Sequence, residues 1–98
     1  MTPLIAVIVR VPPVLRTLTG GRPKLELSLP EGATVADALD QVERDHPALV
    51  RRVRDEQGVL RQHVNVFVGE ESVRVLGGLE TILRADSEIT ILAAISGG

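Results

Sequence analysis

The sequence contains no cysteine, no tryptophan and no tyrosine, and it has a single phenylalanine, Phe67. The absence of cysteine excludes disulfides, thiolate metal sites, cysteine nucleophiles and iron–sulfur clusters held by cysteine. The two histidines, His46 and His63, stand alone, without carboxylates or cysteines at the spacing of metal ligands. We therefore expect no metal site and no bound cofactor.

An excess of charge of one sign is also missing. The formal net charge is −2 with both signs mixed along the chain, which gives no electrostatic reason to expect a nucleic-acid partner. The one basic cluster comprises Arg44, Arg51, Arg52 and Arg54. We interpret it as a solvated helix and loop surface, with contact to an acidic partner as the alternative.

The start of the chain shows no targeting segment. Residues 1–11 have no basic region before their apolar run and no small-residue cleavage site, and Arg10 and Pro12 interrupt the run early. This pattern fits neither a signal peptide nor a membrane span, so we expect no membrane partner and a cytoplasmic location. With 98 residues, of which 44% are hydrophobic and 24% charged, we expect one domain over residues 1–98 with a flexible tail at 94–98.

Two segments in the first third of the chain have strand patterns. Residues 4–11 are almost continuously apolar, which favours a central strand covered on both faces. Residues 24–29 alternate polar and leucine side chains, which indicates a half-buried strand. Residues 14–23, between them, include Gly20 and Gly21 and are predicted as a loop.

The main helix is predicted to begin after Thr34, because Val35, Ala38, Leu39 and Val42 form a helical stripe. Thr34 is the expected N-cap, with Asp37 as its capping-box partner, and Pro47 ends the helix near residues 45–46. The expected later elements are a short second helix at 48–53, a strand at 63–68, a short strand at 73–75, a helical turn at 79–83 and a last strand at 88–95.

This order of elements is typical of an α+β, ubiquitin-like β-grasp domain, with a mixed sheet of four to five strands packed on one main helix. The more apolar first and last strands would lie parallel to each other in the centre of the sheet. A ferredoxin-like α+β sandwich is the alternative, although it would require two full helices.

The end of the sequence, Ser96-Gly97-Gly98, follows directly on the last strand. Glycine has no Cβ, so a Gly-Gly tail is thin enough to enter a narrow channel and to bring the carboxylate of Gly98 to another protein's active site. A frayed end or a remnant of cloning is the alternative explanation.

Four motifs, in their order and spacing, resemble those of the ubiquitin-like sulfur carriers. This family includes the small subunit of molybdopterin synthase, the thiamine sulfur carrier and the cysteine sulfur carriers, and the sequence is most similar to the last group. The motifs are LRTLTGG at residues 15–21, VNVFV at 64–68, VR and LGGL within 73–79, and ITIL through SGG within 89–98. The family tail usually carries a proline where this chain has Ala93 and Ala94.

The resemblance implies a protein co-substrate with no catalytic residue of its own. A partner adenylyltransferase/sulfurtransferase that resembles ubiquitin-activating (E1-like) enzymes would consume ATP to adenylate the carboxylate of Gly98. Sulfide or a persulfide would then displace AMP and leave a thiocarboxylate. By the same resemblance, that sulfur would be passed to a PLP-dependent cysteine synthase or another sulfur-accepting enzyme, and a metalloprotease would process the tail afterwards.

Phe67 lies between two valines that are expected to face the helix, so we expect it on the open face of the sheet. An exposed aromatic there predicts a partner-docking patch, which Leu92 and Ala94 would extend. The alternative is a buried Phe67 with the strand in the other register. Two rival functions remain: a sulfur-carrying subunit of molybdopterin synthase, and a non-catalytic ubiquitin-like binding module that would not depend on Gly98.

Overall fold

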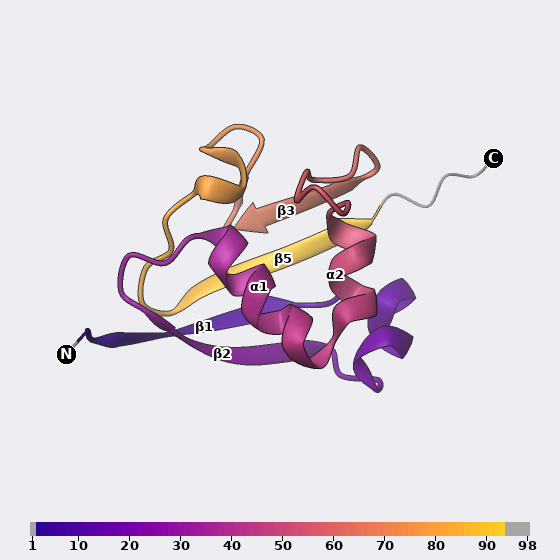
Figure 1. Ribbon diagram of the computed structural model, residues 1–98, viewed down its shortest axis with the longest axis horizontal. Helices are drawn as coiled ribbons and strands as arrows, with labels where there is room; N and C mark the ends of the chain where they lie inside the picture. The colour runs from indigo at the N-terminus through magenta and orange to yellow at the C-terminus, as the bar shows by residue number, and fades with distance from the viewer. Residues whose placement is uncertain (1, 94–98) are drawn as a thin grey trace.

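The computed structural model describes residues 2–93, which form a sheet with helices on one of its faces (Figure 1). The elements are β1 (Leu4–Arg10), η1 (Pro13–Thr19), β2 (Lys24–Pro30), α1 (Val35–Asp45), α2 (Pro47–Val53), β3 (Val64–Val68), β4 (Glu71–Ser72), η2 (Gly78–Glu80) and β5 (Ser87–Ala93), where η denotes a 3-10 helix. The predicted flexible tail, 94–98, lies outside the described residues.

The sheet has the strand order β2-β1-β5-β3-β4. β1 and β5 are parallel and central, and β2 and β3 pair with them in antiparallel fashion. The predicted β-grasp arrangement, with the first and last strands side by side, is confirmed. The ferredoxin-like alternative is wrong, because α1 and α2 follow one another directly between β2 and β3.

One expectation about β1 is wrong, because the strand is covered on one face only. Its residues alternate, with Ile5, Val7 and Val9 buried, while Leu4 on the other face is 67% exposed. Both α1 and α2 lie on the same side of the sheet (Figure 1). We call the opposite side of the sheet the open face. It presents the side chains of β1, β5 and β3 that point away from the helices.

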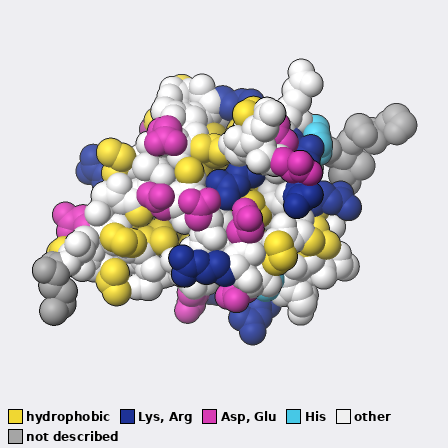
Figure 2. Space-filling view, viewed as in Figure 1, with side chains coloured by type: hydrophobic (Ala, Val, Ile, Leu, Met, Phe, Trp, Pro, Cys, Tyr) yellow, Lys and Arg dark blue, Asp and Glu magenta, His cyan; other side chains and the backbone are white. Residues whose placement is uncertain are grey.

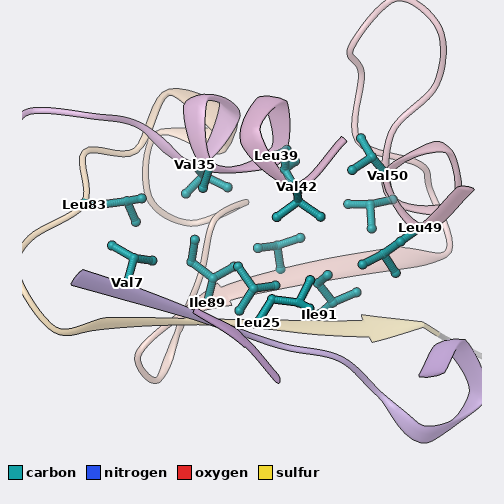
Figure 3. Close-up of a cluster of buried hydrophobic side chains, with 14 of the residues drawn as sticks. Val7, Leu25, Val35, Leu39, Val42, Leu49, Val50, Leu83, Ile89 and Ile91 are labelled. Atoms are coloured by element: carbon teal, nitrogen blue, oxygen red, sulfur yellow. The ribbon is translucent and has the colours of Figure 1, made fainter. Parts of the chain in front are cut away.

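The start of α1 agrees with the prediction in atomic detail. The side-chain hydroxyl of Thr34 accepts a hydrogen bond from the N–H of Asp37 at 3.2 Å, and the Asp37 carboxylate accepts one from the N–H of Thr34 at 2.9 Å. This capping box satisfies two donors that have no partner within the helix. Leu39 and Val42 of α1 point toward Ile89 and Ile91 of β5 in the core (Figure 3).

Two short segments differ from the prediction. Residues 14–23 were expected as a loop, but η1 begins at Pro13, since proline is tolerated at the first helical position and Leu15 is buried against the core. The short strand lies at β4 and not at 73–75. Val73 is fully buried, and the N–H groups of Val75 and Leu76 both bond back to the Ser72 carbonyl, so the chain turns there. The helical turn predicted at 79–83 is confirmed only in part, because the 3-10 helix η2 ends at Glu80 and Ile82 forms an isolated β-bridge with Thr34.

Candidate functional site

Most of the predicted site residues lie near the end of β5 or follow it in the sequence, and Phe67 lies on the neighbouring strand β3. β5 is the strand that leads to them, and its last residue, Ala93, is also the last that the structure describes. Ala94, Ser96, Gly97 and Gly98 lie outside the described residues. The surroundings of Leu92 and Ala93 are therefore the part of the candidate site whose geometry can be examined.

Phe67 and Leu92 share the open face. In the β3–β5 register, Phe67 lies opposite Thr90, and Asn65 lies opposite Leu92, so Phe67 and Leu92 are diagonal neighbours. Such a diagonal is within reach of an aromatic side chain. The structure places Phe67 away from the core, as predicted, although it is half-buried and not fully exposed, whereas Leu92 is 48% exposed. We call Phe67, Thr90 and Leu92 the docking patch, after the role that the sequence predicts for Phe67 and Leu92.

The edge of this patch is held by a hydrogen-bond network. Asn65 Oδ1 accepts from Ser72 Oγ at 2.8 Å, which ties β3 to β4. The guanidinium of Arg74 donates to the carbonyls of Arg61 at 2.9 Å and Val64 at 2.6 Å. These bonds tie the start of β3, beside Leu92, to β4 and to the segment that follows it.

A groove of about 450 Å³ lies on the other side of Leu92, between the ends of β5, β1 and β2 and the start of η1. We call it the exit groove, and its lining includes Arg10, Pro12, Arg16, Pro23, Lys24 and Leu92. It shares Thr90 and Leu92 with the docking patch. Sequence reasoning missed this groove, although one signal was available: residues 1–25 contain no Asp or Glu.

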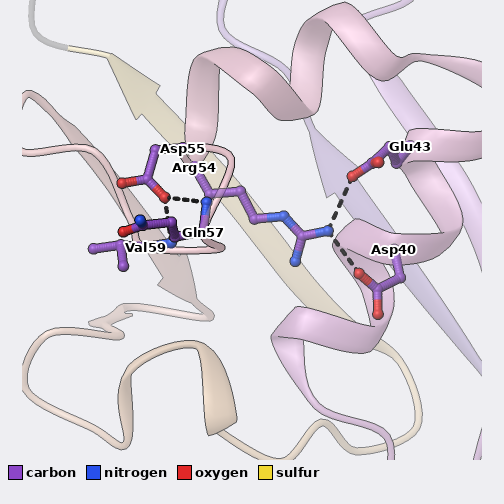
Figure 4. Close-up of polar contacts among 6 residues, drawn as sticks. All are labelled: Asp40, Glu43, Arg54, Asp55, Gln57 and Val59. Carbon is purple, nitrogen blue, oxygen red and sulfur yellow. Dashed lines mark hydrogen bonds and ion pairs between the residues drawn. The ribbon is translucent and has the colours of Figure 1, made fainter.

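Three arginines of the basic cluster, Arg44, Arg51 and Arg52, are exposed as predicted, but Arg54 is not. Arg54 was expected on a solvated surface, but its side chain is only 12% exposed and donates to Asp40 at 2.6 Å and Glu43 at 3.1 Å (Figure 4). Burial disfavours the charged guanidinium, but the hydrogen bonds to Asp40 and Glu43 outweigh it and raise the pKa of Arg54. Arg54 therefore ties α2 to α1.

The rest of this face mixes both signs of charge. Arg51 pairs with Glu56 at 3.3 Å, and acidic and basic side chains are interspersed over α1 and α2 (Figure 2). The N–H of Val59, which donates to Asp55 Oδ1 at 2.9 Å, is the main cause that lowers the pKa of Asp55, and the N–H of Gln57 adds to it. Asp55 thus stays ionised at neutral pH and closes its loop.

Within residues 2–93, no three His, Asp or Glu side chains gather as metal ligands would. The same part of the chain contains no helix that is long and apolar enough to cross a membrane. Among the described residues around Leu92, the polar side chains that are not arginine or lysine are Thr90, Gln62, His63 and Asn65, and no carboxylate lies among them.

A mixed sheet with parallel first and last strands, helices on one face and a terminal segment leaving a central strand defines a ubiquitin-like β-grasp protein. The chain matches the ThiS family over residues 9–98 and belongs to that family of ubiquitin-like sulfur carriers.

Two groups of relatives agree with this assignment. Sulfur carrier protein CysO of Mycobacterium tuberculosis is 34% identical over 94 residues, which cover 94% of this chain and 98% of the relative. A chain in the crystal structure of the Amycolatopsis orientalis BexX/CysO complex is 40% identical, with a TM-score of 0.82 and coverage of 94% of this chain and 99% of that chain. SAMP1 of Haloferax volcanii is 29% identical, with a TM-score of 0.80 and coverage of 95% and 99%.

Proposed function

We propose that this protein carries sulfur as a thiocarboxylate on Gly98 and donates it in biosynthesis, with cysteine as the expected product. Similarity to CysO over almost the whole length of both chains supports this choice of pathway. The observation that carries the proposal is the position of the Gly-Gly end in the sequence, three residues after β5, the central strand that contributes Thr90 and Leu92 to the docking patch.

The chemistry requires an activating partner, because a carboxylate is a poor electrophile. The Gly98 carboxylate attacks the α-phosphorus of ATP on an E1-like adenylyltransferase, and pyrophosphate leaves. Sulfide then attacks the carbonyl carbon of the acyl-adenylate, a C–S bond forms, the C–O bond to AMP breaks, and the thiocarboxylate results. A persulfide of the partner would instead form an acyl disulfide, and a second thiol of the partner must then attack its S–S bond, which releases the thiocarboxylate and leaves a disulfide on the partner. The product is ionised at neutral pH, and its anionic sulfur is the nucleophile that the accepting enzyme uses.

The domain itself supplies recognition. The tail residues 96–98 enter the partner's active site, while the docking patch on the open face holds the rigid domain against the entrance. Binding energy from a surface remote from the reacting atoms can position the carboxylate for attack. The partners proposed are the adenylyltransferase/sulfurtransferase, a PLP-dependent cysteine synthase, and a metalloprotease that processes the tail.

The test is intact-protein mass spectrometry after incubation with ATP, a sulfide source and the adenylyltransferase encoded in the same organism. We expect the mass gain of one oxygen replaced by sulfur on the full chain and no gain on a chain that lacks Gly98. An unchanged full-length mass, with the same enzyme active on another carrier, would instead favour the non-catalytic binding module.

The docking patch makes a separate prediction. Phe67→Ser should weaken binding to the adenylyltransferase about 30-fold, which corresponds to the ~2 kcal/mol of an interface hot-spot residue. The measurement is isothermal titration calorimetry. Leu4→Ser is the matched control, because Leu4 is 67% exposed on the same face of the sheet. It begins β1, whereas Arg10, at the other end of β1, is the residue that pairs with Thr90 of the docking patch. Equal affinities for the two variants would remove Phe67 from the interface.

A further inference from the structure

The exit groove concentrates positive charge where the chain leaves the sheet. Arg10, Arg16 and Lys24 line it, and none of its lining residues is acidic. The chain as a whole has a net charge of −2, so this local excess runs against the average composition. A surface of one sign beside a functional segment favours association with a partner of the opposite sign.

The pairing of β1 with β2 places two of these cations directly against each other. Arg10 and Lys24 are cross-strand partners in the register, so both project from the open face. Like charges directly opposite each other destabilise a sheet. Arg10 is compensated by an ion pair with Glu88, whereas Lys24 forms no ion pair with any carboxylate in the described part of the chain.

The groove is also rigid. The Nε of Arg16 donates to the carbonyl of Val11 at 3.0 Å, which holds this guanidinium at the groove. Pro12 and Pro23 form part of the wall, and their ring-locked backbone cannot adapt widely. A preformed cationic groove loses little conformational entropy when an anionic group binds.

We propose that the exit groove binds an acidic segment of the adenylyltransferase, at the rim of the channel that receives the Gly-Gly end. This inference rests on the proposed function and names the surface that the activating partner must present. The six residues from Ala93 to Gly98 can span at most about 20 Å. The groove adjoins Leu92, the residue just before this segment, so it lies close to the start of the tail that the channel would receive, and it is continuous with the docking patch through Thr90 and Leu92.

The first experiment measures the steady-state kinetics of adenylation with the carrier as the varied substrate. Lys24→Glu should raise KM about 10-fold and leave kcat nearly unchanged, because a charge at an interface rim acts on encounter and not on chemistry. It should also flatten the dependence of kcat/KM on salt concentration. Lys24→Arg keeps the charge and should behave as the unaltered chain.

Arg84→Glu is the matched control for the same change of charge. Arg84 is exposed and precedes β5, so it lies at the opposite end of that strand from the groove. The Arg84→Glu variant should have a KM within about twofold of that of the unaltered chain, because salt screens the effect of a charge on a distant interface. Urea unfolding of each variant would show that the domain remains folded.

The second experiment uses the fact that Lys24 is the only lysine in the sequence. A carbodiimide joins a lysine amine to a carboxylate in contact with it, as an amide with loss of water. We expect peptide mapping to find Lys24 linked to an Asp or Glu of the adenylyltransferase, and the Lys24→Arg variant to lose this link.

The outcomes separate the two proposals. If the unaltered chain is adenylated but Lys24→Glu keeps its KM and salt dependence, the groove does not dock the partner, and the carrier function stands. The same conclusion follows if the adenylyltransferase adenylates the carrier in the reaction mixture but peptide mapping finds no cross-link at Lys24. If the unaltered chain is never adenylated, the carrier function and the docking proposal both fail.

Discussion

Gly97→Val is expected to lower the rate of thiocarboxylate formation by at least about 100-fold, since a misplacement of about 1 Å at the reacting group can cost that much. A β-branched side chain adds bulk and restricts the backbone angles at the residue that precedes the reacting carboxylate. The measurement is the initial rate of mass conversion with ATP, sulfide and the adenylyltransferase in excess.

Ser28→Val controls for the added bulk. Ser28 is exposed on β2 and lies opposite Ala6, toward the end of the sheet remote from Leu92. This variant should be converted at the rate of the unaltered chain. Conversion of Gly97→Val at that same rate would show that the channel does not require a thin tail, and the role assigned to the glycine pair would be wrong.

Ile89→Ala is expected to lower the free energy of unfolding by about 2–5 kcal/mol, the range for a buried Ile or Leu truncated to Ala. Ile89 is fully buried on β5 and faces the helices, and it pairs with Val9 on one side and Val68 on the other. The total free energy of unfolding of such a domain is about 5–15 kcal/mol, so this substitution would remove a large share of its stability. Urea titration at 25 °C would give the shift in midpoint.

The neighbouring residue supplies the control. Thr90 lies on the same central strand but faces the open side of the sheet, where it is half-buried. Thr90→Ala should cost no more than about 1 kcal/mol, which is the span of strand propensity. Similar losses at both positions would contradict the one-sided burial of β5.

The parts of the fold that were predictable from the sequence are those specified by local patterns. The stripe from Val35 to Val42 and the cap at Thr34 define α1 from neighbouring residues alone. The apolar runs at either end of the chain indicated which strands are central. The family motifs then identified the candidate carboxylate, which no pattern of burial could have done.

The features that were missed depend on contacts between distant segments. The exit groove exists because β1 pairs with β2 in the register that puts Arg10 opposite Lys24, and because β5 adds Leu92 beside them. The apolar run of β1 suggested cover on both faces, since composition does not reveal on which side the helices lie. Arg54 looked like a surface cation because its partners, Asp40 and Glu43, belong to another helix.

The position of β5 has a mechanical consequence. The strand that continues into the tail is joined by backbone hydrogen bonds to β1 along one edge and to β3 along the other. An enzyme that grips the tail and pulls along it loads both ladders in shear, so many bonds must fail together before the strand slips. In the proposed function, this arrangement would keep the domain folded while an enzyme holds the tail under tension.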